Sequence, residues 1–204
     1  MPHTETIERT YYKFEELSEE AQEKALENNC YWNVEFSDWH DAVEYDAKAV
    51  GKLTGFDIDT IYFSGFWSQG NGACFEGTCS YARGCVNAVV AYAPYDETLH
   101  LIVWDWYVLQ RKYFYEVYAE VKHSGHYSHS GCTSIDVSIS DDIDPYDTSV
   151  TVELEDEVSR ILRRFMDWIY SRLEKEYEYL TSDEQVKESL IANEIEFDED
   201  GNIA

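Results

Sequence analysis

The stretch FDIDTIYF, residues 56–63, decides the fold, because apolar and polar side chains alternate along it as on a half-buried β-strand. A Gly-rich segment follows, and residues 73–81 then resume a strand-like pattern. The Asn71-Gly72 pair between them is a strong turn signal. The sequence therefore predicts an antiparallel hairpin with strands near residues 58–64 and 73–81.

A second pair of strands is expected further along the chain. Residues 113–122 alternate aromatic or Val side chains with polar ones, and residues 132–140 have a similar pattern. A loop rich in Gly, Ser and His joins them. Two hairpins separated by helical segments indicate an α+β fold class, with a four-stranded, mainly antiparallel sheet covered by helices.

Two helices are expected before the first hairpin. Ser18 is placed to cap a helix that ends near Asn28, and acidic residues in its first turn suit the positive end of the helix dipole. Apolar residues at helical spacing predict a second helix over residues 37–53, and Gly55 is a plausible stop just after it.

The remaining helices lie between and after the strands. Two helices broken near Pro94 are expected between residues 86 and 111, and Ser182 opens a short last helix. Residues 153–179 predict a long helix whose buried stripe consists of Val158, Ile161, Leu162, Phe165, Trp168, Ile169 and Leu173.

The 204 residues are about the length of one domain, so we expect a single α+β domain over residues 1–204. The net charge is −27, from 42 acidic and 15 basic residues, while 16% of the residues are aromatic, unlike a disordered acidic chain. The net charge is −10 over residues 1–60, −3 over 61–140 and −14 over 141–204. Acidic N-terminal helices and an acidic C-terminal helical arm and tail thus flank a nearly neutral centre.

This charge argues against direct binding to nucleic acid or to an anionic membrane, because phosphate contacts need cationic side chains. The sequence contains no run of 18 apolar residues, so no transmembrane helix is expected. The first five residues lack the pattern of a secretory signal. Five cysteines, an odd number, are typical of free thiols in a reducing cytoplasm. We expect a cytoplasmic protein without a cofactor.

Four residues of zinc-ligand type occur at steps of three in the second hairpin loop: His123, His126, His129 and Cys132. On a hairpin loop, steps of three do not converge as residues at i and i+4 do on a helix. We therefore expect no metal site, and metal binding by this loop stays open as the alternative.

Two other groups resemble metal sites only in composition. Cys74, Cys79 and Cys85 have spacings that match no common zinc or iron–sulfur pattern, so we expect buried free thiols. Residues 141–147 are acidic like a calcium loop but lack its glycine and its final glutamate, so we expect a solvated turn.

The Gly-rich segment between the first two strands carries no catalytic motif. It has neither the G-x-S-x-G nucleophile turn nor the lysine of a phosphate-binding loop, so we expect a protein that is not an enzyme. Phe66 and Trp67 are expected to cover the end of the sheet, and a binding role for these aromatic side chains stays open.

Three stretches of the chain resemble a family of acidic proteins found in tailed-phage genomes: YFSGFWSQGNGACF at residues 62–75, HSGHYSHSGC at 123–132 and EYLTSDE at 178–184. The resemblance extends over about residues 17–200. It implies a phage or prophage origin. Some members of this family carry an antitoxin-like label, but the resemblance implies no settled activity and no site residues.

A small, folded, strongly anionic phage protein indicates mimicry of nucleic acid. Duplex DNA carries one charge per about 1.7 Å of axis, so 27 charges correspond to roughly 45 Å of duplex. We expect an inhibitor of the anti-CRISPR or anti-restriction type in the host bacterial cytoplasm. Its partner would be a nucleic-acid-binding defence protein of the host.

The candidate partner-binding residues lie in the two acidic arms and in the aromatic loop. They are Glu15, Glu16, Glu19, Glu20 and Glu23 on the first helix, Glu153, Glu155, Asp156, Glu157, Glu174, Glu176 and Glu178 around the long helix, and Phe66 and Trp67. The alternatives are an antitoxin-like module with aromatic anchors, or a small-molecule-binding protein or enzyme that uses the aromatic loop. The target and the oligomeric state stay open.

Overall fold

The computed structural model describes residues 10–139 and 148–204. The chain divides into two compact units, residues 1–40 with 175–204 and residues 41–174. The single domain expected over residues 1–204 stays a prediction. The expected turn at residues 141–147 and the last residue of the strand predicted at 132–140 lie outside the described residues.

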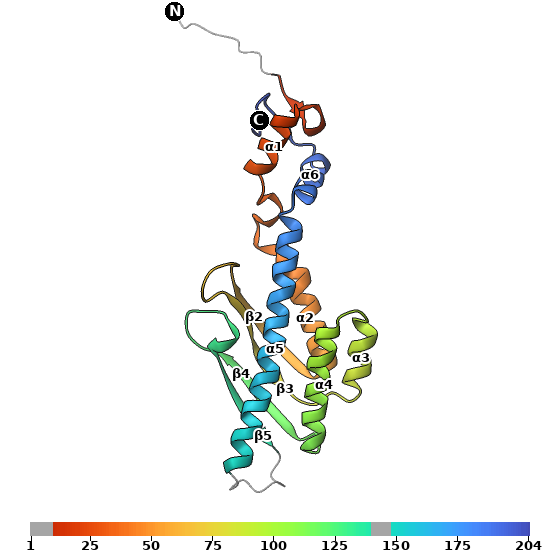
Figure 1. Ribbon diagram of the computed structural model, residues 1–204, viewed down its shortest axis with the longest axis vertical. Coiled ribbons are helices and arrows are strands. Elements are labelled where there is room, and N and C mark those ends of the chain that lie inside the picture. The colour runs from red at the N-terminus through yellow and green to blue at the C-terminus, as the bar shows by residue number, and fades with distance from the viewer. Residues whose placement is uncertain (1–9, 140–147) are drawn as a thin grey trace, which may run out of the picture. The chain divides into compact units, whose positions relative to one another are not determined.

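The larger unit contains a four-stranded sheet (Figure 1). Its strands lie in the order β2-β3-β4-β5, and each pairs antiparallel with its neighbour. The strands are β2 (Phe56–Ser64), β3 (Gly72–Cys79), β4 (Val117–His123) and β5 (Thr133–Ile139). The predicted α+β class with a four-stranded antiparallel sheet is confirmed.

Helices pack against one face of this sheet. They are α2 (Asp41–Thr54), α4 (Glu97–Lys112) and α5 (Thr148–Leu180), whose last residues belong to the smaller unit, while α3 (Cys85–Tyr92) packs against α2 and α4. The break between α3 and α4 includes Pro94, as predicted, and Gly55 with φ of 98° follows α2. None of the described helices is long and apolar enough to cross a membrane.

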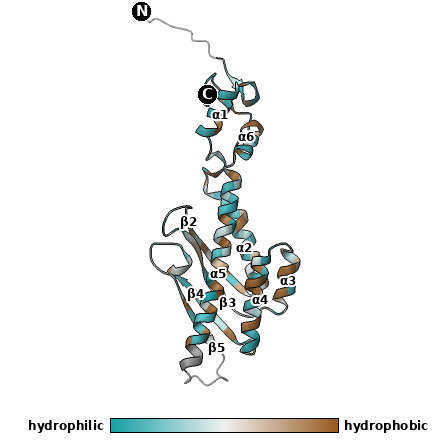
Figure 2. Ribbon diagram, in the orientation of Figure 1, coloured by the Kyte–Doolittle hydropathy of each residue, from teal (hydrophilic) through white to brown (hydrophobic). Residues whose placement is uncertain are grey.

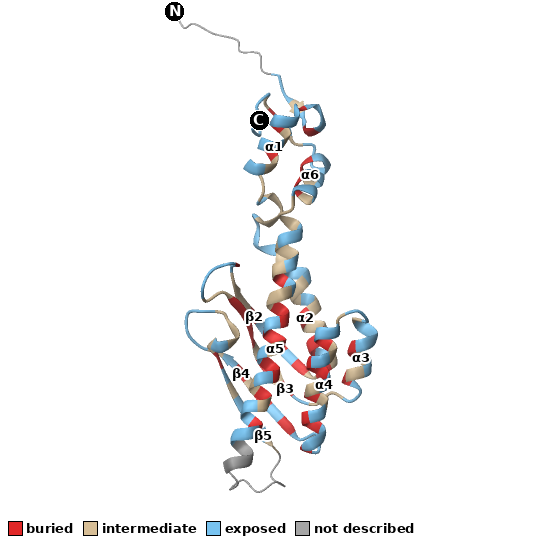
Figure 3. Ribbon diagram, in the orientation of Figure 1, coloured by how far each residue is buried: buried red, intermediate tan, exposed pale blue. Residues whose placement is uncertain are grey.

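The core of the larger unit lies between the sheet and the helices α4 and α5 (Figure 3). The Phe56 ring of β2 lies 5.1 Å from the ring of Trp106 on α4 and 5.1 Å from that of Phe165 on α5. Ile161, Phe165 and Trp168 are all buried, which confirms the predicted stripe of the long helix. On β4, buried Val and Ala residues alternate with accessible ones, because only one face of the strand is covered.

The prediction of a strand from residue 113 is wrong at its beginning. Tyr113 is the C-cap of α4, and Phe114 and Tyr115 have φ of 55° and 68°, so the chain turns sharply before β4. The buried Gln110 side chain stabilises this turn, since its amide bonds to both the carbonyl and the amide of Val117. The alternation of aromatic and polar residues there comes from a helix cap and not from a strand.

The loop between β2 and β3 is longer than the Asn71-Gly72 turn signal predicts. Gly72 is not at the tip of a tight turn, because it already pairs with Ser64 as the first residue of β3. A Cβ atom on Gly72 would lie 2.6 Å from the Cα of His129, so a glycine is needed where the second hairpin loop packs against this strand.

Gly77 offers a sensitive test of the strand pairing. It has φ of 153°, and an added Cβ would lie 2.0 Å from the carbonyl oxygen of Asp57, beside the irregularity in β2. Gly77→Ala is expected to lower the free energy of unfolding by about 1–3 kcal/mol. Gly84→Ala is the matched control, because Gly84 also has positive φ but no atom within 4 Å. Equal urea midpoints for the two variants would contradict the close approach.

The smaller unit has its own apolar core. It contains β1 (Tyr12–Lys13), a 3₁₀ helix at Phe14–Glu16, α1 (Glu19–Asn28), α6 (Asp183–Ala192) and β6 (Glu196–Phe197), with β1 and β6 paired antiparallel. Ser18 and Ser182 cap α1 and α6 as predicted. The buried cluster consists of Phe14, Leu17, Ala21, Ala25, Val186, Leu190 and Phe197.

Candidate functional site

A row of exposed carboxylates runs along α1. Glu19, Glu23 and Glu27 follow one another at steps of four, Glu20 lies three residues before Glu23, and all four are exposed, while Ala21 and Ala25 are buried. Residues at these spacings are about 5–6 Å apart. The row therefore presents four negative charges over about 12 Å of a helix whose opposite side is packed.

Two of the acids predicted on the first helix lie outside it. Glu15 and Glu16 are exposed but lie in the preceding 3₁₀ helix, which the Leu17-Ser18 step separates from α1. The Glu16 carboxylate accepts a hydrogen bond of 2.8 Å from the Lys13 amide, so it caps its own turn. Glu27 was not among the predicted residues, although it lies on α1 and its spacing of four from Glu23 is visible in the sequence.

The last helix, α6, adds a second set of acids in the smaller unit. Asp183, Glu184 and Glu188 are exposed, and Val186 and Leu190 on the same helix are buried in the core that α1 also covers. By sequence, this unit has 70 residues and a net charge of −15 out of −27 for the whole chain. More than half of the net charge thus belongs to about a third of the residues.

The acids of α5 are divided between the two units. In the larger unit Glu153, Glu155 and Asp156 are exposed. The Lys112 Nζ lies 3.6 Å from a carboxylate oxygen of Glu153 and of Glu157, so a cation of the same chain compensates both glutamates. Glu174 in the larger unit and Glu176 in the smaller one are half-buried, whereas Glu178 is exposed. The α5 acids are therefore a weaker candidate surface than those of α1.

The two aromatic residues of the β2–β3 loop have different environments. Phe66 is buried, with its ring 5.5 Å from that of Tyr170 on α5, so it is a packing residue. Trp67 is 70% exposed, with φ of 65°. Of these two residues, only Trp67 is placed to act as an aromatic anchor.

The second hairpin loop brings together two of its four predicted ligand types. The Cys132 Sγ lies 3.3 Å from the His129 Nε2, and the Gly131 amide donates to the His129 Nδ1 at 3.1 Å. His123 instead contacts the Tyr127 carbonyl at 2.9 Å, and His126 is exposed. Among residues 10–139 and 148–204, no group of three or more His, Cys, Asp or Glu residues could hold a metal ion.

A polar cluster that the sequence did not reveal lies beside this loop. The Tyr62 hydroxyl donates to Glu76 at 2.8 Å, which raises the pKa of Tyr62. The His123 ring stacks on that of Tyr62 at 4.5 Å, and its backbone amide donates to Glu76 at 3.1 Å. The Glu76 side chain thus connects β3 with β2 and β4. These contacts give the cluster a structural role, because they hold three strands of the sheet together.

The thiols are free, as predicted. Cys74, Cys79 and Cys85 are buried, and burial raises the pKa of Cys74 to about 12. Burial also raises the pKa of Cys79 and Cys85. Because the thiolate is the nucleophile, these raised pKa values lower the reactive fraction of the three thiols at neutral pH.

The described features define an α+β protein with a densely acidic smaller unit. A family model described as "Domain of unknown function (DUF8835)" matches residues 39–183. The chain belongs to this family. Comparison with curated proteins and with solved structures found no match.

Proposed function

We propose that the protein is a phage-encoded inhibitor that acts as an acidic DNA mimic in the cytoplasm of the host bacterium. It would occupy the nucleic-acid-binding surface of a host defence protein of the CRISPR or restriction type. The inhibition requires no catalytic step, cofactor or metal. Because the protein repels phosphates, it would contact its target and not the nucleic acid itself.

The observation that carries this proposal is the exposed acid row of α1. Carboxylates that imitate phosphates need fixed positions, because ordering a mobile side chain or segment on binding costs free energy. The packed side of α1, with Ala21 and Ala25 in the core of the smaller unit, holds the helix in place. The Lys and Arg residues of a DNA-binding protein could then pair with the row and release counterions as they do on DNA.

Competition at varied salt tests the proposal. A labelled duplex is bound to purified CRISPR and restriction complexes from the host, and its fluorescence anisotropy is followed as the protein is added. We expect the protein to displace the duplex. Its affinity for the target should fall at least about 10-fold between 50 and 200 mM salt. Simultaneous binding of duplex and protein, with no loss of affinity for either, would rule out mimicry.

The salt dependence also separates mimicry from the antitoxin-like alternative. An interface anchored on Trp67 would depend on apolar burial and would change little with salt. If binding resists salt and is lost in Trp67→Ala, the protein is a binding module with an aromatic anchor and not a DNA mimic.

A further inference from the structure

Helix α4 is apolar on two sides, and only one of them is covered. Its buried side consists of Leu99, Ile102, Val103, Trp106 and Leu109. On the outer side Leu101 is 59%, Trp104 51% and Val108 47% exposed. Figure 2 shows hydrophobic residues along much of α3 and α4. Exposed apolar side chains that gather on one side of a helix, with polar residues at the rim, mark an interaction site.

The exposed residues of α4 have the spacing of a helix-pairing seam. Glu97, Leu101, Trp104, Val108 and Arg111 follow one another at alternating steps of four and three, and all five are exposed. This is the heptad spacing that keeps one stripe of a helix in contact with a partner helix. We call these five residues the α4 seam.

The seam is complementary to itself. Glu97 lies seven residues before Trp104, and Arg111 lies seven residues after it. If two copies of α4 pack antiparallel around a two-fold axis near Trp104, Glu97 of each copy faces Arg111 of the other. Leu101 of each copy then lies opposite Tyr107 and Val108, as an isologous interface requires.

Charge favours a second copy at this place. Two chains of −27 repel each other over most of their surfaces, but α4 has two acidic and two basic residues and no net charge. Asp105, the acid nearest the middle of the seam, is engaged within its own chain by Arg164, and Arg160 lies 4.0 Å away. The seam therefore brings no uncompensated carboxylates together.

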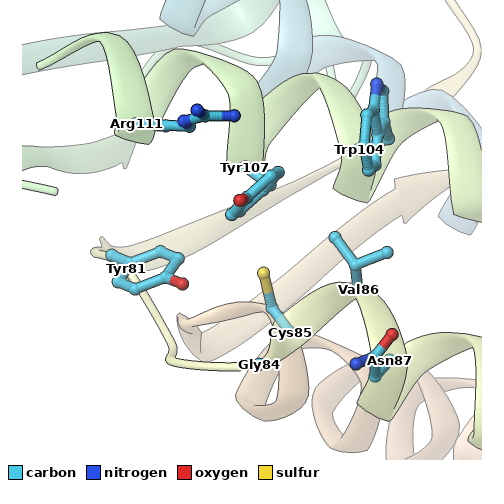
Figure 4. Close-up of a pocket in the computed structure, with 8 residues that line it drawn as sticks. All are labelled: Tyr81, Gly84, Cys85, Val86, Asn87, Trp104, Tyr107 and Arg111. Carbon is cyan, nitrogen blue, oxygen red and sulfur yellow. The ribbon is translucent and has the colours of Figure 1, made fainter.

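A pocket beside the seam provides space for a partner side chain. Its volume is about 350 Å³, and Trp104, Tyr107 and Arg111 form one wall (Figure 4). Tyr81, Cys85 and Val86 belong to the opposite wall. In the antiparallel arrangement, Leu101 of the second copy points to this wall of α4, as a knob enters a hole.

We infer that the protein forms a homodimer through antiparallel pairing of the α4 seams. The inference is independent of the proposed function, because the seam lies in the larger unit and none of its residues belongs to the acid row of α1.

The oligomeric state of the full chain is the direct test, measured by sedimentation equilibrium at physiological salt. The wild-type protein is expected to have twice the mass of one chain. Val108→Glu is expected to weaken dimerisation at least 10-fold, with circular dichroism as the check on folding. Trp67→Glu is the matched control, because it places the same charge on another exposed apolar residue of the larger unit, and it should remain dimeric.

A charge swap tests the register of the pairing. Glu97 and Arg111 are about 21 Å apart along one helix, too far to interact within a chain. Glu97→Arg and Arg111→Glu should each weaken the dimer several-fold, and the double variant should restore it. A monomeric wild-type protein, a dimeric Val108→Glu variant, or a double variant no stronger than the single ones would overturn the inference.

Discussion

Replacement of Trp168 by alanine is expected to lower the free energy of unfolding by about 3–5 kcal/mol. The side chain is 6% exposed, and its ring stacks on that of Phe165 at 5.3 Å. Its indole N–H donates to the Asp96 carboxylate at 2.8 Å, and the other oxygen of Asp96 caps α4 through the Leu99 amide. The substitution therefore opens a cavity and also removes a donor from the residue that caps the neighbouring helix.

Urea unfolding followed by circular dichroism measures this loss. Trp168→Phe keeps an aromatic ring at this site but loses the hydrogen bond and part of the indole volume, so it should cost less than Trp168→Ala, about 1–3 kcal/mol. Trp67→Ala is the exposed control and should change stability by less than about 0.5 kcal/mol. A Trp168→Ala variant as stable as this control would mean that α5 is not packed as described.

Much of the fold could be predicted because local signals and burial agree. Ser18 and Ser182 cap their helices, and the apolar spacing on α5 identified Ile161, Phe165 and Trp168 as core residues. In these elements the periodicity reflects a single buried face, which a sequence shows directly.

The failures occur where distant contacts override the local pattern. Phe114 and Tyr115 adopt positive φ because Gln110 fixes the turn from inside the core, and no local preference of these aromatic residues predicts that. His129 lies so close to Gly72 that an added Cβ there would be 2.6 Å from its Cα, and this packing of two hairpins cannot be read from the local sequence.

The candidate surface was only partly predictable for a related reason. Charge counts identified the acidic arms, but they could not show that Glu16 caps a turn or that Lys112 compensates Glu153 and Glu157. The α4 seam was visible as a heptad spacing in the sequence. The other side of the same helix has an apolar stripe of equally regular spacing, and a sequence does not show which of the two stripes is buried.

Reversal of the α1 row is expected to abolish inhibition. Glu19, Glu20, Glu23 and Glu27 would all be changed to Lys, which shifts the net charge from −27 to −19. If each carboxylate contributes about 0.7 kcal/mol to the complex, four of them contribute about 3 kcal/mol, or roughly 100-fold in affinity. Like-charge repulsion from the target's Lys and Arg residues adds to this loss, whereas each single change should act weakly.

A control with the same total charge decides whether position matters. Asp57, Asp59, Glu116 and Asp136 are exposed in the larger unit, and their change to Lys also gives −19. Plating efficiency of a sensitive phage on a defended host that expresses each variant is the readout. The control should still inhibit, while the α1 variant should not.

A Glu→Gln version of the α1 set guards against unfolding, because glutamine keeps the helix propensity of glutamate. If both sets lose inhibition equally, the protein acts through its overall field and the α1 row is not a mimic of ordered phosphates.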